Sequence, residues 1–200
     1  MRLVVPAFDR NEEVNVVFKT PHHRDYRLDW KEKMTTVARA TSAALTYLPV
    51  FSLGARRFGD GGIWANDPVM LDLVDALACH DVDRHDVRIL SLGRGSETGR
   101  ISDGQTSRGG QWVWRTATAT AMRLASQNAL GQAGLLVGRE RLLRLDHALG
   151  DDPIELDGHE RVVAKLPGIA VDLVNRNEER PRQLFGRKRN LFIPFHGDVR

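Results

Sequence analysis

Two adjacent glycines preceded by an aspartate, Asp60-Gly61-Gly62, form the feature that most constrains how this chain can fold. Glycine has no Cβ, so two in succession allow a sharp turn and a close approach to neighbouring backbone. A carboxylate held just before such a turn is exposed and fixed by the backbone, which suits a general base. The same pattern is typical of a plain turn into a helix, with Asp60 as a turn residue only. The flanking sequence is needed to choose between these two roles.

Sequence on both sides of this turn resembles the patatin-like phospholipases, a family of lipid acyl hydrolases. The alanine-rich residues 38–44 resemble the helix that leads into the family's Asp-Gly-Gly strand. Downstream, Trp64-Ala-Asn-Asp-Pro68 resembles the family's Trp-Ala-Asn-Asn-Pro, and Ile89-Leu-Ser-Leu-Gly93 resembles its next strand. The resemblance covers residues 1–95 and continues weakly to about residue 175.

The resemblance implies an activity and a set of site residues. It assigns Asp60 as the general base of a Ser-Asp dyad that hydrolyses a phospholipid or another acyl-ester lipid, in contact with a membrane surface. The motif residues that accompany this base are Gly61, Gly62, Trp64 and Asn66. It implies no cofactor.

The serine of that dyad is missing from the sequence. In the family it lies in a Gly-x-Ser-x-Gly elbow upstream of the aspartate, beyond a glycine-rich oxyanion loop, and the 200 residues contain no Gly-x-Ser-x-Gly. The nearest pattern, Gly93-Arg-Gly-Ser96-Glu-Thr-Gly99, has a different spacing and follows Asp60. Ser42 falls inside the expected alanine-rich helix, where serine usually bonds back to the preceding turn. The resemblance therefore implies the C-terminal half of such an enzyme, inactive alone. A split gene with the N-terminal half encoded separately, a truncation and an internal start all fit this pattern.

Apolar segments alternating with helical patterns predict an α/β fold. Residues 3–8 and 14–18 are expected to be strands, and the first needs a neighbour on each side, which predicts an open apolar edge there. The strand ending at Asp60, a helix and a strand at residues 87–92 fit a βαβ unit with parallel pairing. Together with the resemblance, these elements predict the C-terminal part of a three-layer α/β/α sandwich with a mostly parallel sheet.

Capping residues and periodicity predict where the first helices begin. Asp29 with Glu32 fits a capping box for a helix that ends near residue 44. Asp67 is expected to cap a second helix, with Pro68 at its first position. The apolar faces expected to be buried are Met34, Val37, Ala38 and Thr41 in the first helix and Met70, Leu73, Val74 and Leu77 in the second.

The C-terminal part is expected to contain two further helical regions and a tail. Residues 112–136 and 162–173 have helical patterns, the second bent at Pro167. Residues 1–178 are therefore expected to be the C-terminal portion of the catalytic domain. Residues 179–200 form a basic and aromatic tail, which either contacts anionic lipid or is an exposed extension.

Composition narrows the class of protein. A chain with 42% hydrophobic and 28% charged residues is typical of a globular domain. A net charge of +3 is far below the clustered positive charge of a dedicated nucleic-acid binder, so nucleic-acid binding is not expected. No apolar run reaches the roughly 18 residues that cross a bilayer. The single cysteine, Cys79, excludes an internal disulfide and favours a reducing compartment, hence a cytoplasmic location, with peripheral contact to the inner membrane left open. The pair His22-His23 lacks a third ligand at zinc spacing, so no metal is expected.

A second function remains open on the residues alone. If Asp60 is only a turn residue, the chain is a non-catalytic α/β module that binds a partner or a membrane. A Gly-x-Ser-x-Gly segment encoded beside it would favour the hydrolase instead.

Overall fold

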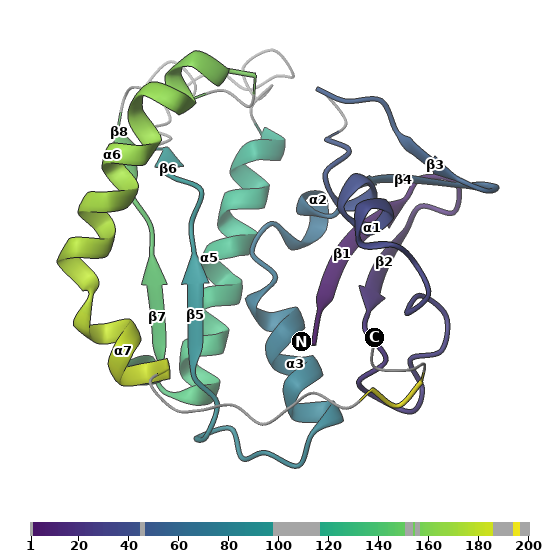
Figure 1. Ribbon diagram of the computed structural model, residues 1–200, viewed down its shortest axis with the longest axis horizontal. Coiled ribbons are helices and arrows are strands. Elements are labelled where there is room, and N and C mark those ends of the chain that lie inside the picture. Colours follow the sequence, from purple (N-terminus) through teal and green to yellow (C-terminus); the bar gives the residue numbers. More distant parts are fainter. Residues whose placement is uncertain are drawn as a thin grey trace.

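The computed structural model describes residues 2–44, 47–97, 117–150, 154, 157–185 and 194–196. These residues form two groups of strands, and helices α3 (Val69–Cys79) and α5 (Ala117–Val137) lie between them in the view of Figure 1. The α/β class expected from the sequence is confirmed.

The larger sheet is antiparallel, with the strand order β2-β1-β4-β3. Its strands are β1 (Val4–Asp9), β2 (Val14–Lys19), β3 (Phe51–Leu53) and β4 (Arg56–Asp60). Strand β1 pairs with β2 on one side and with β4 on the other, where Ala7 lies opposite Asp60. Strand β2 pairs with the whole of β1, whereas β4 pairs only with residues 7–9, so the predicted open edge is closed there and residues 4–6 have no strand partner on that side among the described strands.

Helix α1 (Met34–Thr41) packs on this sheet and completes a hydrophobic core. The buried members of the core are Ala7, Phe18, Val37, Ala40 and Phe58. The side chain of Ala40 is small and has no exposed surface, so the helix approaches the sheet closely there. Of the face predicted for this helix, Val37 is buried, but Met34 is 58% exposed and Ala38 is also exposed.

The start of α1 differs from the predicted start. Lys33 is its N-cap residue, and Met34 is its first helical residue. Asp29 and Glu32 form a separate turn, in which the Glu32 amide donates to the Asp29 backbone carbonyl at 3.0 Å. The predicted capping box is wrong, because Asp29 and Glu32 belong to this separate turn and the helix begins only at Met34.

Two short parallel pairs make up the remaining strands. Strand β5 (Ile89–Leu92) pairs with β7 (Leu142–Leu145), and β6 (Ser96–Glu97) pairs with β8 (Ala148–Gly150). Strand β5 does not pair with β4. The predicted βαβ pairing with the Asp60 strand is therefore wrong, and the largest described sheet is antiparallel rather than mostly parallel.

Helices α3 and α5 cover one face of the β5–β7 pair and form a second core. Its buried residues are Val69, Leu73, Ala133 and Val137. Met70 and Leu77 pack against this core as predicted, whereas Val74 is 55% exposed. Val69, the first residue of the helix, takes the buried position instead.

The short 3-10 helix η1 (Arg139–Arg141) connects α5 to β7. The C-terminal elements are the helices α6 (His159–Asn177), which contains Pro167, and α7 (Glu179–Phe185). The expected tail thus starts as a helix. Farther on, the Phe195 amide donates to the Pro21 carbonyl at 2.7 Å. Residues 98–116, 186–193 and 197–200, which include part of the predicted helix at 112–136 and most of the tail, lie outside the described residues. None of the described helices is both long and apolar enough to cross a membrane.

A buried polar cluster ties the end of β2 to α3. The Asp75 carboxylate accepts hydrogen bonds from Lys19 Nζ and from the Tyr26 hydroxyl, both at 2.7 Å, and lies 2.6 Å from His22 Nε2. Burial alone would raise the pKa of Asp75, but the bonds from these three residues outweigh it and hold the pKa below its usual value. His22 therefore has a structural partner, and in the described ranges no three His, Cys, Asp or Glu side chains are grouped as metal ligands.

Candidate functional site

Asp60 is the last residue of β4, at the point where the strand turns into the short helix α2 (Gly62–Ala65). Its backbone amide donates to the Ala43 carbonyl at 3.0 Å, which joins the strand to the chain that follows α1. Its half-buried carboxylate accepts a hydrogen bond through Oδ1 from the Gly62 amide at 2.7 Å. The backbone on both sides therefore fixes the orientation of the Asp60 side chain.

A side chain at Gly61 and a side chain at Gly62 would meet different neighbours. A Cβ at Gly61 would lie 2.2 Å from the Pro6 carbonyl oxygen, so no other residue fits against β1 there. A Cβ at Gly62 would lie 3.1 Å from Asp60 Oδ1 and 3.5 Å from Asn66 Oδ1. Gly62 thus lies between the side chains of Asp60 and Asn66, and both polar groups face the same small space.

Trp64 and Asn66 anchor α2 in opposite directions. The Trp64 indole donates to the Ala7 carbonyl of β1 at 2.9 Å. The Asn66 amide donates to Ser126 Oγ of α5 at 3.1 Å. These bonds hold the turn between the antiparallel sheet and α5, so the motif residues Gly61, Gly62, Trp64 and Asn66 lie together around Asp60.

Asp67 links this turn to the parallel strands. Its Oδ1 accepts the Val69 amide at 3.1 Å, but α3 begins at Val69 with Pro68 as its N-cap, so the predicted cap lies one residue too early. Its Oδ2 accepts hydrogen bonds from Arg144 at 2.7 Å and from the Ser91 hydroxyl at 3.2 Å. Asp67 thus binds the first amide of α3 and is also a buried ion-pair partner.

The sequence analysis missed the other half of that ion pair. Arg144 of β7 bridges two carboxylates, because its second guanidinium nitrogen donates to Asp146 at 2.9 Å. The Asp146 carboxyl packs so tightly on Gly93 that a Cβ there would lie 2.0 Å from it. A weak signal was present in the sequence: Arg144 is a charged residue in an apolar strand, and Asp146 follows two positions later, just after the strand ends.

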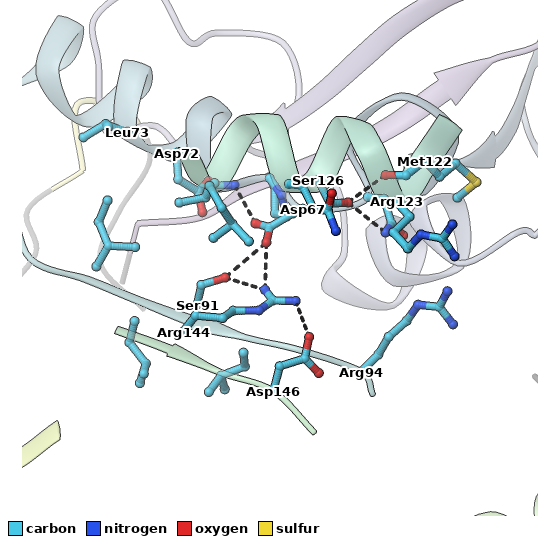
Figure 2. Close-up of a pocket in the computed structure, with 18 of the residues that line it drawn as sticks. Asp67, Asp72, Leu73, Ser91, Arg94, Met122, Arg123, Ser126, Arg144 and Asp146 are labelled. Atoms are coloured by element: carbon cyan, nitrogen blue, oxygen red, sulfur yellow. Dashed lines mark hydrogen bonds and ion pairs between the residues drawn. The ribbon is translucent and has the colours of Figure 1, made fainter. Parts of the chain in front are cut away.

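A pocket of about 860 Å³ opens beside these residues (Figure 2). Its lining includes every residue from 87 to 92, and also Asn66, Arg144 and Asp146. Residues of α3 and α5, among them Asp72 and Arg123, form the opposite wall, so the pocket lies between these two helices and β5.

The serines of the described chain do not reach Asp60. Ser42 Oγ donates to the Ala38 carbonyl at 2.7 Å, the back-bond expected for a helical serine. Ser126 Oγ donates to the Met122 carbonyl at 2.8 Å, and Ser91 is bonded to Asp67. Within the ranges that the structure describes, no serine hydroxyl is hydrogen-bonded to the Asp60 carboxylate.

The chain is similar to bacterial proteins named cGAMP-activated phospholipase. It is 27% identical over 203 residues to the one from Pseudomonas aeruginosa, a match that covers 97% of this chain and 57% of the relative. The relatives from Escherichia coli and Vibrio cholerae are 36% and 32% identical over 50% and 46% of this chain, and over 30% and 28% of their own lengths. The chain therefore spans little more than half, or less, of each of these relatives. No model of a known protein family matches it.

Proposed function

We propose that this chain supplies Asp60 as the general base of a lipid acyl hydrolase that cleaves phospholipid esters with a Ser-Asp dyad. The observation that carries the proposal is the Asp60 carboxylate, held by the Gly62 amide at 2.7 Å at the carboxyl end of β4. The word phospholipase in the names of the similar proteins supports the substrate class. Gly61, Gly62, Trp64 and Asn66 keep the base in position.

In the proposed reaction, Asp60 accepts the proton of a serine hydroxyl while the serine oxygen attacks the ester carbonyl carbon. Oδ1 is bonded to the Gly62 amide, and the described residues give Oδ2 no hydrogen bond, so Oδ2 is the proton acceptor. The proton passes to the departing alcohol oxygen as its bond to the carbonyl carbon breaks. Water then attacks the acyl-enzyme, with Asp60 again as the base, and releases the fatty acid. Backbone amides of a glycine loop stabilise the oxyanion in both steps.

The serine must come from a Gly-x-Ser-x-Gly segment that these 200 residues do not contain. Among the described strands β5 pairs only with β7, so its other edge can pair with a further parallel strand that carries the serine. In open α/β sheets the reacting groups gather at the carboxyl ends of the strands, which is the end where Gly95 lines the pocket. The chain then corresponds to the C-terminal part of a three-layer α/β/α enzyme, with residues 1–178 in the catalytic domain and 179–200 as its tail.

The proposed setting is the cytoplasmic face of the inner membrane, where the substrate lies. A second candidate is a non-catalytic module that binds a partner or a membrane. One observation favours it: Val163, Val171 and Val174 of α6 are 59–60% exposed and lie on one face of that helix. An exposed apolar face of this kind is typical of a docking surface.

The test compares this chain alone with this chain joined to the remaining part of the Pseudomonas aeruginosa relative. Fatty-acid release from phosphatidylglycerol vesicles is measured for both. The proposal predicts no release by the chain alone and clear release by the joined protein. A folded joined protein without activity would favour the non-catalytic module. Release by the chain alone that Ser91→Ala abolishes would instead identify Ser91, beside Asp67, as the nucleophile.

A further inference from the structure

One end of the β5 pocket contains arginines that have no acidic partner among the described residues. Four arginines and three aspartates line the pocket: Arg88, Arg94, Arg123, Arg144, Asp67, Asp72 and Asp146. Arg144 is bonded to both Asp67 and Asp146. Within the described ranges, neither Arg94 nor Arg123 is in an ion pair. Two unpaired guanidinium groups in one pocket attract an anion.

The arginine end of the pocket is connected to the candidate base through α5 and Asn66. Figure 2 shows Arg94 and Arg123 at the same end of the pocket, away from Asp72 and Leu73. Arg94 follows the carboxyl end of β5, and Arg123 is on α5 three residues before Ser126. Ser126 is bonded to Asn66, which lies across Gly62 from Asp60. The cationic end of the pocket and the candidate base therefore lie on either side of Asn66.

The remaining lining favours an acyl lipid over a nucleotide as the source of the anion. Leu90, Leu92, Met122 and Leu130 line the pocket, and Leu92 is 69% exposed. In its described lining there is no Phe, Tyr, Trp or His side chain on which a base could stack. Base-binding sites usually contain such rings. Aliphatic walls beside two arginines fit acyl chains attached to a phosphate.

We propose that Arg94 and Arg123 form a subsite for the phosphate of a phospholipid, with the guanidinium groups binding the phosphate oxygens. The proposal rests on the lipid-hydrolase function above and adds to it the reason for a phospholipid rather than a neutral acyl ester. The phosphate group orients the glycerol so that one ester points towards Asp60. The half-buried Arg123 fixes the phosphate position, and the exposed Arg94 closes over it from the end of β5.

The test measures binding to the 200-residue chain by calorimetry. The probes are monomeric dihexanoyl phosphatidylglycerol, dihexanoylglycerol, which lacks the phosphate, and cyclic GMP–AMP. Arg94→Gln and Arg123→Gln are each expected to raise the Kd for the phosphatidylglycerol about tenfold, the loss of one charge-assisted contact, without changing the Kd for dihexanoylglycerol. Arg10→Gln, at the exposed β1–β2 turn, is the matched control and should change neither. The phosphatidylglycerol should also bind more weakly at high salt.

Other outcomes overturn the proposal. If the arginine variants bind the charged and the neutral lipid with equally weakened affinity, or with unchanged affinity, the two arginines do not bind the phosphate. Loss of cyclic GMP–AMP binding alone would assign the arginines to a nucleotide. Arg123→Lys, which keeps the charge, replaces Arg123→Gln if thermal melting shows that Arg123→Gln is unfolded. Asp60→Asn should leave the Kd for the lipid unchanged, because Asp60 is not part of the phosphate subsite. The binding measurement therefore tests the subsite, and the fatty-acid release measured above tests the hydrolase assignment, so the failure of one is distinguished from the failure of the other.

Discussion

The Asp60 carboxylate accepts the Gly62 amide at 2.7 Å across Gly61, a residue whose α-carbon is packed against the Pro6 carbonyl. The turn is therefore formed by contact with β1 and not by local preference alone. Trp64 and Asn66 extend this contact to Ala7 and to Ser126. This packing means that the position of the carboxylate depends on the whole antiparallel sheet.

Gly61→Ala should destabilise the protein strongly. The new Cβ would lie 2.2 Å from Pro6 O and 2.8 Å from the Ala7 amide nitrogen, so β1 and β4 must separate. We expect a loss of about 3 kcal/mol in the free energy of unfolding, the upper range for overpacking. Gly131→Ala is the control, because a Cβ at this position in α5 meets nothing within 4 Å, and it should stabilise by up to about 1 kcal/mol. Urea denaturation gives both values, and similar midpoints for the two variants would contradict the packing argument.

Arg144→Met should show how much the buried ion pair supports the pocket. It leaves the Asp67 side chain, only 6% exposed, without its positive partner. Breaking a buried pair on one side costs about 3–5 kcal/mol. Arg176→Met removes an exposed pair with Asp172 on α6 and should cost less than about 0.5 kcal/mol. Chemical denaturation of both variants checks the contrast, and equal losses would mean that Arg144 has no special role.

The Asp75 cluster predicts a pH dependence of stability with a definite sign. Since hydrogen bonds lower the pKa of Asp75 in the folded state, its stabilisation is complete above the unfolded pKa of about 4 and is lost as the pH falls through the lower folded pKa. The Asp75→Asn variant should therefore be less stable than wild type by about 3 kcal/mol at pH 7 and by much less near pH 2. A difference that stays constant with pH would contradict the ionised cluster.

Asp72 should behave in the opposite way. Asp72 lines the pocket, where a partial loss of solvation, together with the charges of Asp75 and Asp67, raises its pKa to about 6. The folded protein then binds more protons than the unfolded chain between about pH 4 and 6, so stability falls as the pH rises through this window. Asp72→Asn should remove that fall, and because Asp72 is exposed the gain at pH 7 should be at most about 1 kcal/mol. Urea denaturation of wild type and variant at pH 4 and 7 measures this difference.

Local patterns predicted the elements better than their pairing. The strands at residues 3–8 and 14–18 and the helix after Asp67 follow from runs of apolar residues, and the structure contains all three. Which strands pair depends on residues far apart: β5 pairs with a strand about fifty residues later instead of with β4. A local βαβ rule could not predict that choice.

The candidate site was predictable only where one short segment contains it. Residues 60–66 form a continuous motif, so Asp60 and its neighbours could be identified together. Arg144 could not, because its partners Asp67 and Ser91 lie 77 and 53 residues away and meet it only through the fold. Arg94 and Arg123 belong to different elements for the same reason.

The central claim is that Asp60 is the base, and one rate comparison tests it most directly. In the protein made by joining this chain to the remaining part of the Pseudomonas aeruginosa relative, fatty-acid release is measured with Asp60 and with Asp60→Asn. Asn keeps the acceptor for the Gly62 amide but cannot take up a proton, so the fold should survive while the rate falls by about 10²–10⁴-fold, the usual contribution of a general base. An Asp60→Asn protein that is folded and hydrolyses phospholipid at the unchanged rate would contradict the account.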